Sequence, residues 1–76
     1  MDTVEQQIAQ ALQDELGRPV TAADSLGRLG IDSLRMAELA SGLEHRFGIR
    51  VDEELLDVDT VEELADYVRR RMSDAQ

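Results

Sequence analysis

A serine stands at the predicted junction between a loop and a helix, where its hydroxyl is available for chemistry. Residues 29–34 read LGIDSL, so Asp32 comes directly before Ser33 and Leu34 directly after it. Serine is a favoured N-cap, and helix capping alone explains a serine at such a position. A helix N-terminus also presents free backbone N–H groups and a partial positive charge, which accommodate a phosphodiester. Ser33 therefore suits both a cap and a hydroxyl that receives a covalent group.

The other reactive side chains offer no catalytic partner for this serine. The chain contains no cysteine, and its single histidine, His45, lies about 18 Å of helix rise beyond Ser33. A serine–histidine–acid arrangement is therefore not expected. Asp57 and Asp59 match the first two ligand positions of a calcium loop, but Glu62 stands where such a loop requires glycine. We expect neither an enzyme nor a metal-binding protein.

Length and charge narrow the class of protein further. With 76 residues the chain is expected to form one domain, residues 1–76, and to be a monomer. Its net charge of −9 argues against a nucleic-acid binder and suits a protein that meets basic partner surfaces. No apolar run approaches the roughly 18 residues of a membrane helix, so a cytoplasmic protein without membrane contact is expected.

Hydrophobic periodicity predicts an all-α fold, a four-helix bundle with a short third helix. The first two helices are expected at Thr3–Leu16 and Ser33–Phe47, with a long loop between them. The acidic segment Asp52–Val58 is expected to form one or two helical turns. Thr60 and Glu63 have the spacing of a capping box, which indicates the start of the last helix.

The same periodicity predicts which side chains face the core. Gly48 is expected to end the second helix, and Leu34 falls on the face of that helix opposite its apolar stripe. Leu34 is therefore predicted to be exposed beside Ser33. The arginine triplet at 69–71 is interpreted as a solvated complement to the helix dipole. The apolar stripe of the last helix is predicted to comprise Val61, Leu64, Ala65, Val68 and Met72.

The chain resembles the acyl carrier protein family over nearly its whole length. The residues that carry the resemblance are Gly30-Ile31-Asp32-Ser33-Leu34, Glu38-Leu39 and Phe47-Gly48-Ile49. In that family a phosphopantetheinyl transferase moves 4′-phosphopantetheine from coenzyme A to the serine of the Asp-Ser-Leu motif. The arm then carries acyl groups as thioesters. The resemblance implies that Ser33 is the attachment residue, with Asp32 and Leu34 as its recognition neighbours.

The distribution of charge departs from the bacterial fatty-acid type of carrier, which usually bears several acids along the second helix. Here residues 33–51 contain two acids and three arginines, and the negative charge gathers in residues 52–63. We therefore hypothesise a polyketide or other specialised pathway rather than bulk fatty-acid synthesis. The resemblance implies acyl-loading, condensing and modifying enzymes with basic docking surfaces as partners. The residues expected to bind them are Leu34, Arg35, Glu38, Asp52, Glu53, Glu54 and Asp57.

Three alternatives remain open from the residues alone. An aminoacyl or peptidyl carrier shares the architecture and the serine, although such carriers often lack the Gly-Ile-Asp form of the motif. An unmodified acidic adaptor that binds a basic protein through residues 52–63 would make Ser33 an ordinary cap. Separately, Ala37, Ala40 and Gly42 make the middle of the second helix small, which suits either a cleft for a short acyl chain or close helix packing.

Overall fold

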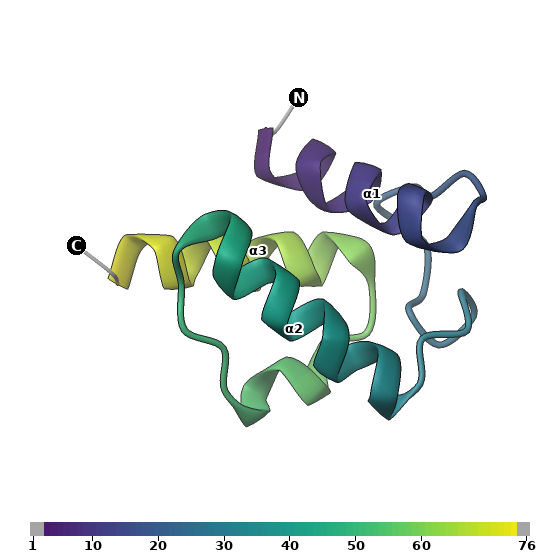
Figure 1. Cartoon of the computed structure of the whole chain (residues 1–76). Helices are drawn as coiled ribbons and strands as arrows, with labels where there is room; N and C mark the ends of the chain where they lie inside the picture. Colours follow the sequence, from purple (N-terminus) through teal and green to yellow (C-terminus); the bar gives the residue numbers. More distant parts are fainter. Residues whose placement is uncertain (1–2, 75–76) are drawn as a thin grey trace.

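The structure, a computed structural model, describes residues 3–74 and is helical throughout its regular elements. It contains α1 (Thr3–Leu16), α2 (Ser33–Phe47), the 3-10 helix η1 (Glu53–Asp57) and α3 (Val61–Asp74). Figure 1 shows α2 and α3 running in the opposite direction to α1. The predicted all-α class and the bounds of the first two helices are confirmed.

The expected four-helix bundle is not confirmed, because the third helical segment is no α-helix. Leu55 donates to the carbonyl of Asp52 at 3.1 Å, and Val58 donates to that of Leu55 at 3.1 Å. These are the i-to-i+3 bonds of a 3-10 helix, which rarely extends beyond a few residues. The described chain is thus a bundle of three α-helices with one short 3-10 helix between α2 and α3.

The long loop before α2 is held against the start of α3 by backbone hydrogen bonds. Within residues 17–32, Leu26 donates to the carbonyl of Asp59 at 2.8 Å, and Val61 donates to the carbonyl of Asp24 at 3.1 Å. Side chains from the loop also enter the core; the buried ones are Val20, Leu26 and Leu29. Because the loop is anchored at these points, the position of the first turn of α2 is set by α3.

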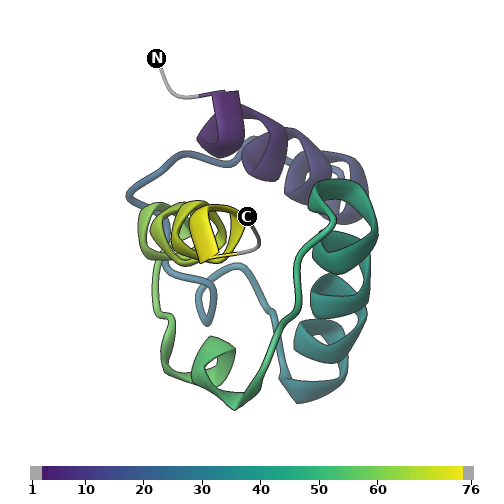
Figure 2. The ribbon, with the colours of Figure 1, turned by 90° about the vertical axis from the view of Figure 1, so that its left-hand side faces the viewer.

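The core is organised around α3. Figure 2 looks along this helix and shows α1, α2, η1 and the long loop around it. The apolar stripe predicted for α3 is buried except for Met72, which is 37% exposed. Tyr67 was not predicted as a core residue, yet only 2% of it is exposed. The largest fully buried side chains are Tyr67, Ile8, Leu12, Leu64, Val61 and Val68.

One glycine within α2 and the glycine that caps its C-terminus give opposite predictions for stability. Gly48 caps the helix in the left-handed conformation, with φ 64° and its N–H donating to the Glu44 carbonyl. That conformation disfavours a side chain, so Gly48→Ala is expected to lower the free energy of unfolding by about 1 kcal/mol. Gly42 lies within the helix, and a Cβ there would meet no atom within 4 Å. Gly42→Ala is therefore expected to raise the free energy of unfolding by about 0.5–1 kcal/mol. Urea denaturation measures both changes, and a shift of the same sign in both would contradict this account.

Candidate functional site

The start of α2 is capped by Asp32, and Ser33 is the first helical residue. Asp32 has extended backbone angles, and its Oδ1 accepts a hydrogen bond from the Arg35 backbone N–H at 2.9 Å. Its carbonyl accepts from the Met36 N–H at 2.8 Å. The expectation that Ser33 caps the helix is therefore wrong. The physical reason is that the carboxylate one residue earlier already reaches the N–H that a cap must satisfy.

The Ser33 side chain is left exposed and without a role in the fold. Its hydroxyl forms no hydrogen bond with any residue that the structure describes. Leu34 beside it is 69% exposed, as predicted, and Gly30 turns the preceding backbone with φ 84°. The first N–H groups of α2 have no carbonyl within the helix to bond, and they carry the positive end of its dipole. A phosphate ester on this hydroxyl would lie beside those groups.

Among residues 3–74, no side chain forms a hydrogen bond with the Ser33 hydroxyl through which it could act as a base. The carboxylate of Asp32 is engaged in the helix cap, and His45 lies in the last turn of the same helix. Nor do the described residues contain a group of three or more histidine, cysteine or acidic side chains arranged to hold a metal ion. The arrangement can present a hydroxyl and stabilise an attached anion.

The residues predicted to bind partners fall into two groups at one end of the molecule. Leu34, Arg35 and Glu38 are exposed on α2, and Arg35 pairs with Glu15 of α1 at 3.3 Å. The acidic residues of 52–57 are exposed on and just before η1. Figures 1 and 2 both place η1 and the first turn of α2 at the same end of the bundle.

Within the acidic group, Asp52 is engaged in holding η1 against α3. Its Oδ1 accepts from the Tyr67 hydroxyl at 2.9 Å, and the Tyr67 oxygen accepts from the Asp52 backbone N–H at 3.1 Å. Arg71 donates to Asp52 Oδ2 at 2.5 Å and to Glu54 Oε2 at 3.2 Å. The hydrogen bond from Tyr67 is the main cause that lowers the pKa of Asp52; the Glu54 N–H and Arg71 add to it, against partial desolvation.

This network corrects one interpretation of the sequence. Arg71 was interpreted as a solvated dipole complement, but it joins the two elements and lies 5.1 Å from the centre of the Tyr67 ring. Asp52 and Glu54, which we expect to meet partners, are exposed and also pair with Arg71 within the chain. Glu53 and Asp57 have no pairing within the described part of the chain. Tyr67 itself lies three positions after Leu64, so a wider apolar stripe would have included it.

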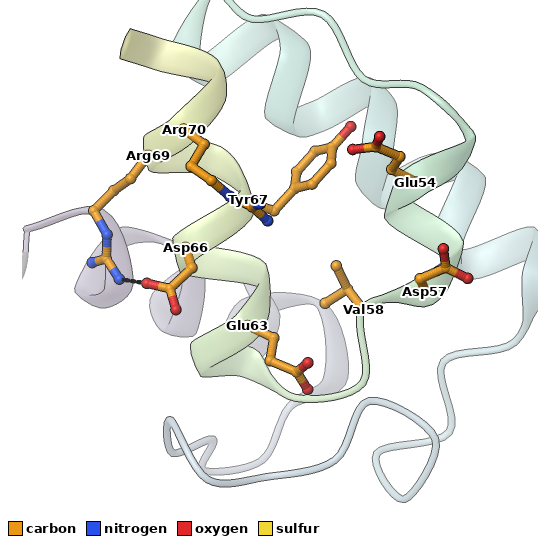
Figure 3. A pocket seen from close by; sticks show the side chains of 8 residues that line it. All are labelled: Glu54, Asp57, Val58, Glu63, Asp66, Tyr67, Arg69 and Arg70. Atoms are coloured by element: carbon orange, nitrogen blue, oxygen red, sulfur yellow. Dashed lines mark hydrogen bonds and ion pairs between the residues drawn. The ribbon is translucent and has the colours of Figure 1, made fainter. Parts of the chain in front are cut away.

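A surface hollow of about 690 Å³ lies beside this network, between η1 and α3 (Figure 3). Asp66 and Arg69 form an ion pair at its edge. Acidic side chains dominate its other walls, so it presents negative charge next to η1. The residues that line it are Glu54, Asp57, Val58, Glu63, Asp66, Tyr67, Arg69 and Arg70.

Comparison with known proteins gives the family. A family model described as the phosphopantetheine attachment site matches residues 6–68. The chain is 39% identical to acyl carrier protein 1, chloroplastic, of Hordeum vulgare over an aligned segment of 59 residues. This segment covers 76% of this chain and 40% of that protein. It is 42% identical to acyl carrier protein 1, chloroplastic, of Spinacia oleracea over an aligned segment of 50 residues. This segment covers 64% of this chain and 36% of that protein.

The fold is also that of a carrier protein. The crystal structure of an acyl carrier protein from Thermotoga maritima superposes with a TM-score of 0.78 at 18% identity, covering 97% of this chain and 96% of that one. No helix among the described residues is long and apolar enough to cross a membrane. The match to the attachment-site model covers most of the sequence and includes the exposed serine at the start of α2. This chain therefore belongs to the acyl carrier protein family, whose members are carriers of 4′-phosphopantetheine and not enzymes.

Proposed function

We propose that Ser33 receives the 4′-phosphopantetheine arm. The observation that carries this proposal is the exposed, unpartnered hydroxyl of Ser33 at the first residue of α2, with Asp32 taking over the cap. The other serines at described positions lie elsewhere: Ser25 in the long loop, Ser41 within α2, and Ser73 in the last turn of α3. Only Ser33 combines exposure with the free N–H groups of a helix start.

The residues around Ser33 fit the cofactor. The hydroxyl would form the phosphodiester, whose charge the start of α2 stabilises. When bound, the arm supplies a thiol that holds acyl groups as thioesters, and partner enzymes supply the chemistry. The protein then contributes a compact body of residues 1–76, an accessible attachment point and a surface that partner enzymes bind.

Intact mass spectrometry tests the attachment directly. After incubation with coenzyme A and a broad-specificity phosphopantetheinyl transferase, the parent is expected to gain one phosphopantetheine and Ser33→Ala none. Ser41→Ala is the matched control, because Ser41 is an exposed serine of the same helix, and it should load like the parent. If the folded parent gains no mass while a control carrier is modified in parallel, the unmodified adaptor becomes the better proposal.

For the pathway, we propose a specialised acyl product such as a polyketide, handled by a monomer in the cytoplasm. The support is the near-neutral segment from residue 33 to 51 and the acidic segment that follows it. Acyl-loading, condensing and modifying enzymes with basic docking surfaces suit that distribution of charge. The two plant relatives are named as chloroplastic proteins. Within the carrier class, a carrier of amino-acid or peptide cargo is the second candidate function.

Charge reversal on η1 tests the proposed docking of partners. Glu53 and Asp57 are exposed there and take no part in the network of Asp52. The double substitution Glu53→Lys with Asp57→Lys therefore reverses surface charge and leaves that network intact. We expect a lower association rate with the partner enzyme, and hence slower turnover at low salt. Asp14→Lys is the control, since a cation at the end of α1 complements the helix dipole. Equal slowing by the control and by the η1 pair would contradict docking at η1.

A further inference from the structure

The 3-10 helix η1 depends on its neighbours for its position. It has only five residues, and a helix this short is not stable by itself in water. Leu55 is the one η1 side chain that is buried, whereas Leu56 beside it is 66% exposed. A single apolar anchor lets a short segment tilt or shift, so polar contacts at the start of η1 must fix its place.

Those polar contacts converge on Asp52, the N-cap of η1. Its Oδ1 accepts from the Glu54 N–H at 3.1 Å, which caps the element, and from the Tyr67 hydroxyl at 2.9 Å. Arg71 donates to Asp52 Oδ2 at 2.5 Å and to Glu54 Oε2 at 3.2 Å. We call these four residues the clasp. Two side chains of α3 thus hold both carboxylates at the start of η1.

The α3 side of the clasp is fixed by its own packing. Tyr67 lies in the buried core, and Figure 3 shows its ring extending from α3 toward Glu54. The Arg71 guanidinium lies 5.1 Å from the centre of that ring, within the range of a cation–π contact, and Arg71 is half-buried. The donors that meet η1 therefore belong to side chains that are themselves held in place.

The η1 side of the clasp carries the charges proposed to meet partners. Glu53 follows Asp52 directly and Asp57 ends η1, and both are exposed and unpaired within the described chain. Their carboxylates are therefore presented wherever the clasp holds η1. Electrostatic steering of a partner depends on where such charges stand as well as on how many there are.

We propose that Arg71 is a positioning residue for partner docking, which holds η1 so that Glu53 and Asp57 meet the basic surface of a partner. The inference rests on the proposed docking at η1 and adds to it a residue of α3 that lies outside the docking element. Arg71 acts through Asp52 and Glu54, and it needs no contact of its own with the partner.

This role and a plain effect of charge predict changes of opposite sign. Arg71 is a cation beside an acidic docking element, so removing its charge makes that element more negative. By charge alone, Arg71→Gln should bind a basic partner faster. If Arg71 positions η1, the same substitution releases Asp52 and Glu54, lets η1 move and weakens docking.

Kinetics of phosphopantetheine loading measure which sign holds. The carrier is the varied substrate, coenzyme A is in excess, and a broad-specificity phosphopantetheinyl transferase is the partner. We expect Arg71→Gln to raise the KM for the carrier by about three- to tenfold, with kcat unchanged. Arg71→Lys keeps the charge but lacks the planar fork that holds two carboxylates, so it should restore only part of the affinity.

Three further variants separate positioning from charge and from general stability. Arg70→Gln removes the same charge from the neighbouring exposed position, which has no pairing within residues 3–74, and should not raise KM. Tyr67→Phe removes one bond of the clasp with no change of charge and should raise KM. Ile8→Val weakens the core in α1, on the far side of α3 from η1 (Figure 2), and should leave KM unchanged.

Amide hydrogen exchange of the free carrier tests the movement of η1 without any partner. The Leu55 and Val58 N–H groups donate the hydrogen bonds at the two ends of η1. We expect both to exchange faster in Arg71→Gln than in the parent or in Arg70→Gln. Unchanged exchange in Arg71→Gln would mean that Arg71 does not hold η1, which overturns the inference.

The kinetic outcomes distinguish this inference from the proposed function. If the parent loads and Arg71→Gln has an equal or lower KM, the positioning role is overturned and attachment at Ser33 stands. A rise of KM in Ile8→Val as large as in Arg71→Gln would also overturn it. If Glu53→Lys with Asp57→Lys leaves KM unchanged, docking at η1 fails and the positioning role fails with it. Absence of loading in the parent would overturn the attachment proposal, and this inference with it.

Discussion

Alanine at position 33 is expected to abolish phosphopantetheine loading and to change the free energy of unfolding by no more than about 0.5 kcal/mol. The loss of loading follows because the hydroxyl is the atom that would bond to phosphorus. The small effect on stability follows because the Ser33 hydroxyl makes no hydrogen bond within the described chain and the side chain is exposed. Intact mass and urea denaturation on the same samples measure the two quantities.

Asp32→Ala is expected to show the reverse pattern. Its Oδ1 accepts the N–H of Arg35, so removing the carboxylate should lower the free energy of unfolding by about 1 kcal/mol, within the range of 0.5–2 measured for caps. The Ser33 hydroxyl remains, so the final mass gain should persist, whereas the rate of loading should fall because Asp32 is an expected recognition neighbour of the attachment residue. Asp32→Asn keeps a capping oxygen and serves as the control for stability. Destabilisation by Ser33→Ala equal to that of Asp32→Ala would mean that the serine, and not the aspartate, supports the helix.

The long helices were predictable because their signals are local. The apolar periodicity that indicates a helix over 3–16 and over 33–47 is carried by the residues of each helix themselves. The cap at Gly48 and the capping box of Thr60 with Glu63 are equally local. In the structure Glu63 N–H donates to Thr60 Oγ1 at 3.1 Å, and Thr60 N–H to Glu63 Oε1 at 3.3 Å.

The features that the sequence did not reveal depend on contacts between segments. Asp52 meets Tyr67 and Arg71 across 15 and 19 positions of the chain, and no periodicity within one helix reports such a pairing. The groove of about 210 Å³ between α1 and α2 depends likewise on the distance between these two helices. The choice of Asp32 over Ser33 as cap is local, but two neighbouring residues of capping type compete, and only the backbone conformation decides between them.

Tyr67→Ala is expected to give the largest loss of stability among these substitutions, about 3–5 kcal/mol by comparison with other large aromatic deletions. Tyr67 is 2% exposed and belongs to the buried core, so removal of its ring leaves a cavity. The control is Tyr67→Phe, which keeps the ring and removes only the hydroxyl that donates to Asp52. Thermal and urea unfolding compare the two. A loss in Tyr67→Phe as large as in Tyr67→Ala would mean that the hydroxyl, and not the ring, dominates.

The phenylalanine variant also predicts a change in how stability depends on pH. The Tyr67 hydroxyl is the main cause that lowers the pKa of Asp52 below its usual 3.8, so the folded protein favours the ionised carboxylate. That contribution is fully present above the unfolded pKa, and it is lost as the pH falls through the lower folded pKa. Tyr67→Phe should therefore be less stable than the parent at neutral pH, and the difference should narrow below about pH 3.8. Asp52→Asn removes the titrating group, so the same tyrosine substitution made in that background should show no such narrowing. Suppose instead that the difference in stability between the parent and Tyr67→Phe stays constant as the pH falls below about 3.8. Asp52 would then not be the group through which Tyr67 acts.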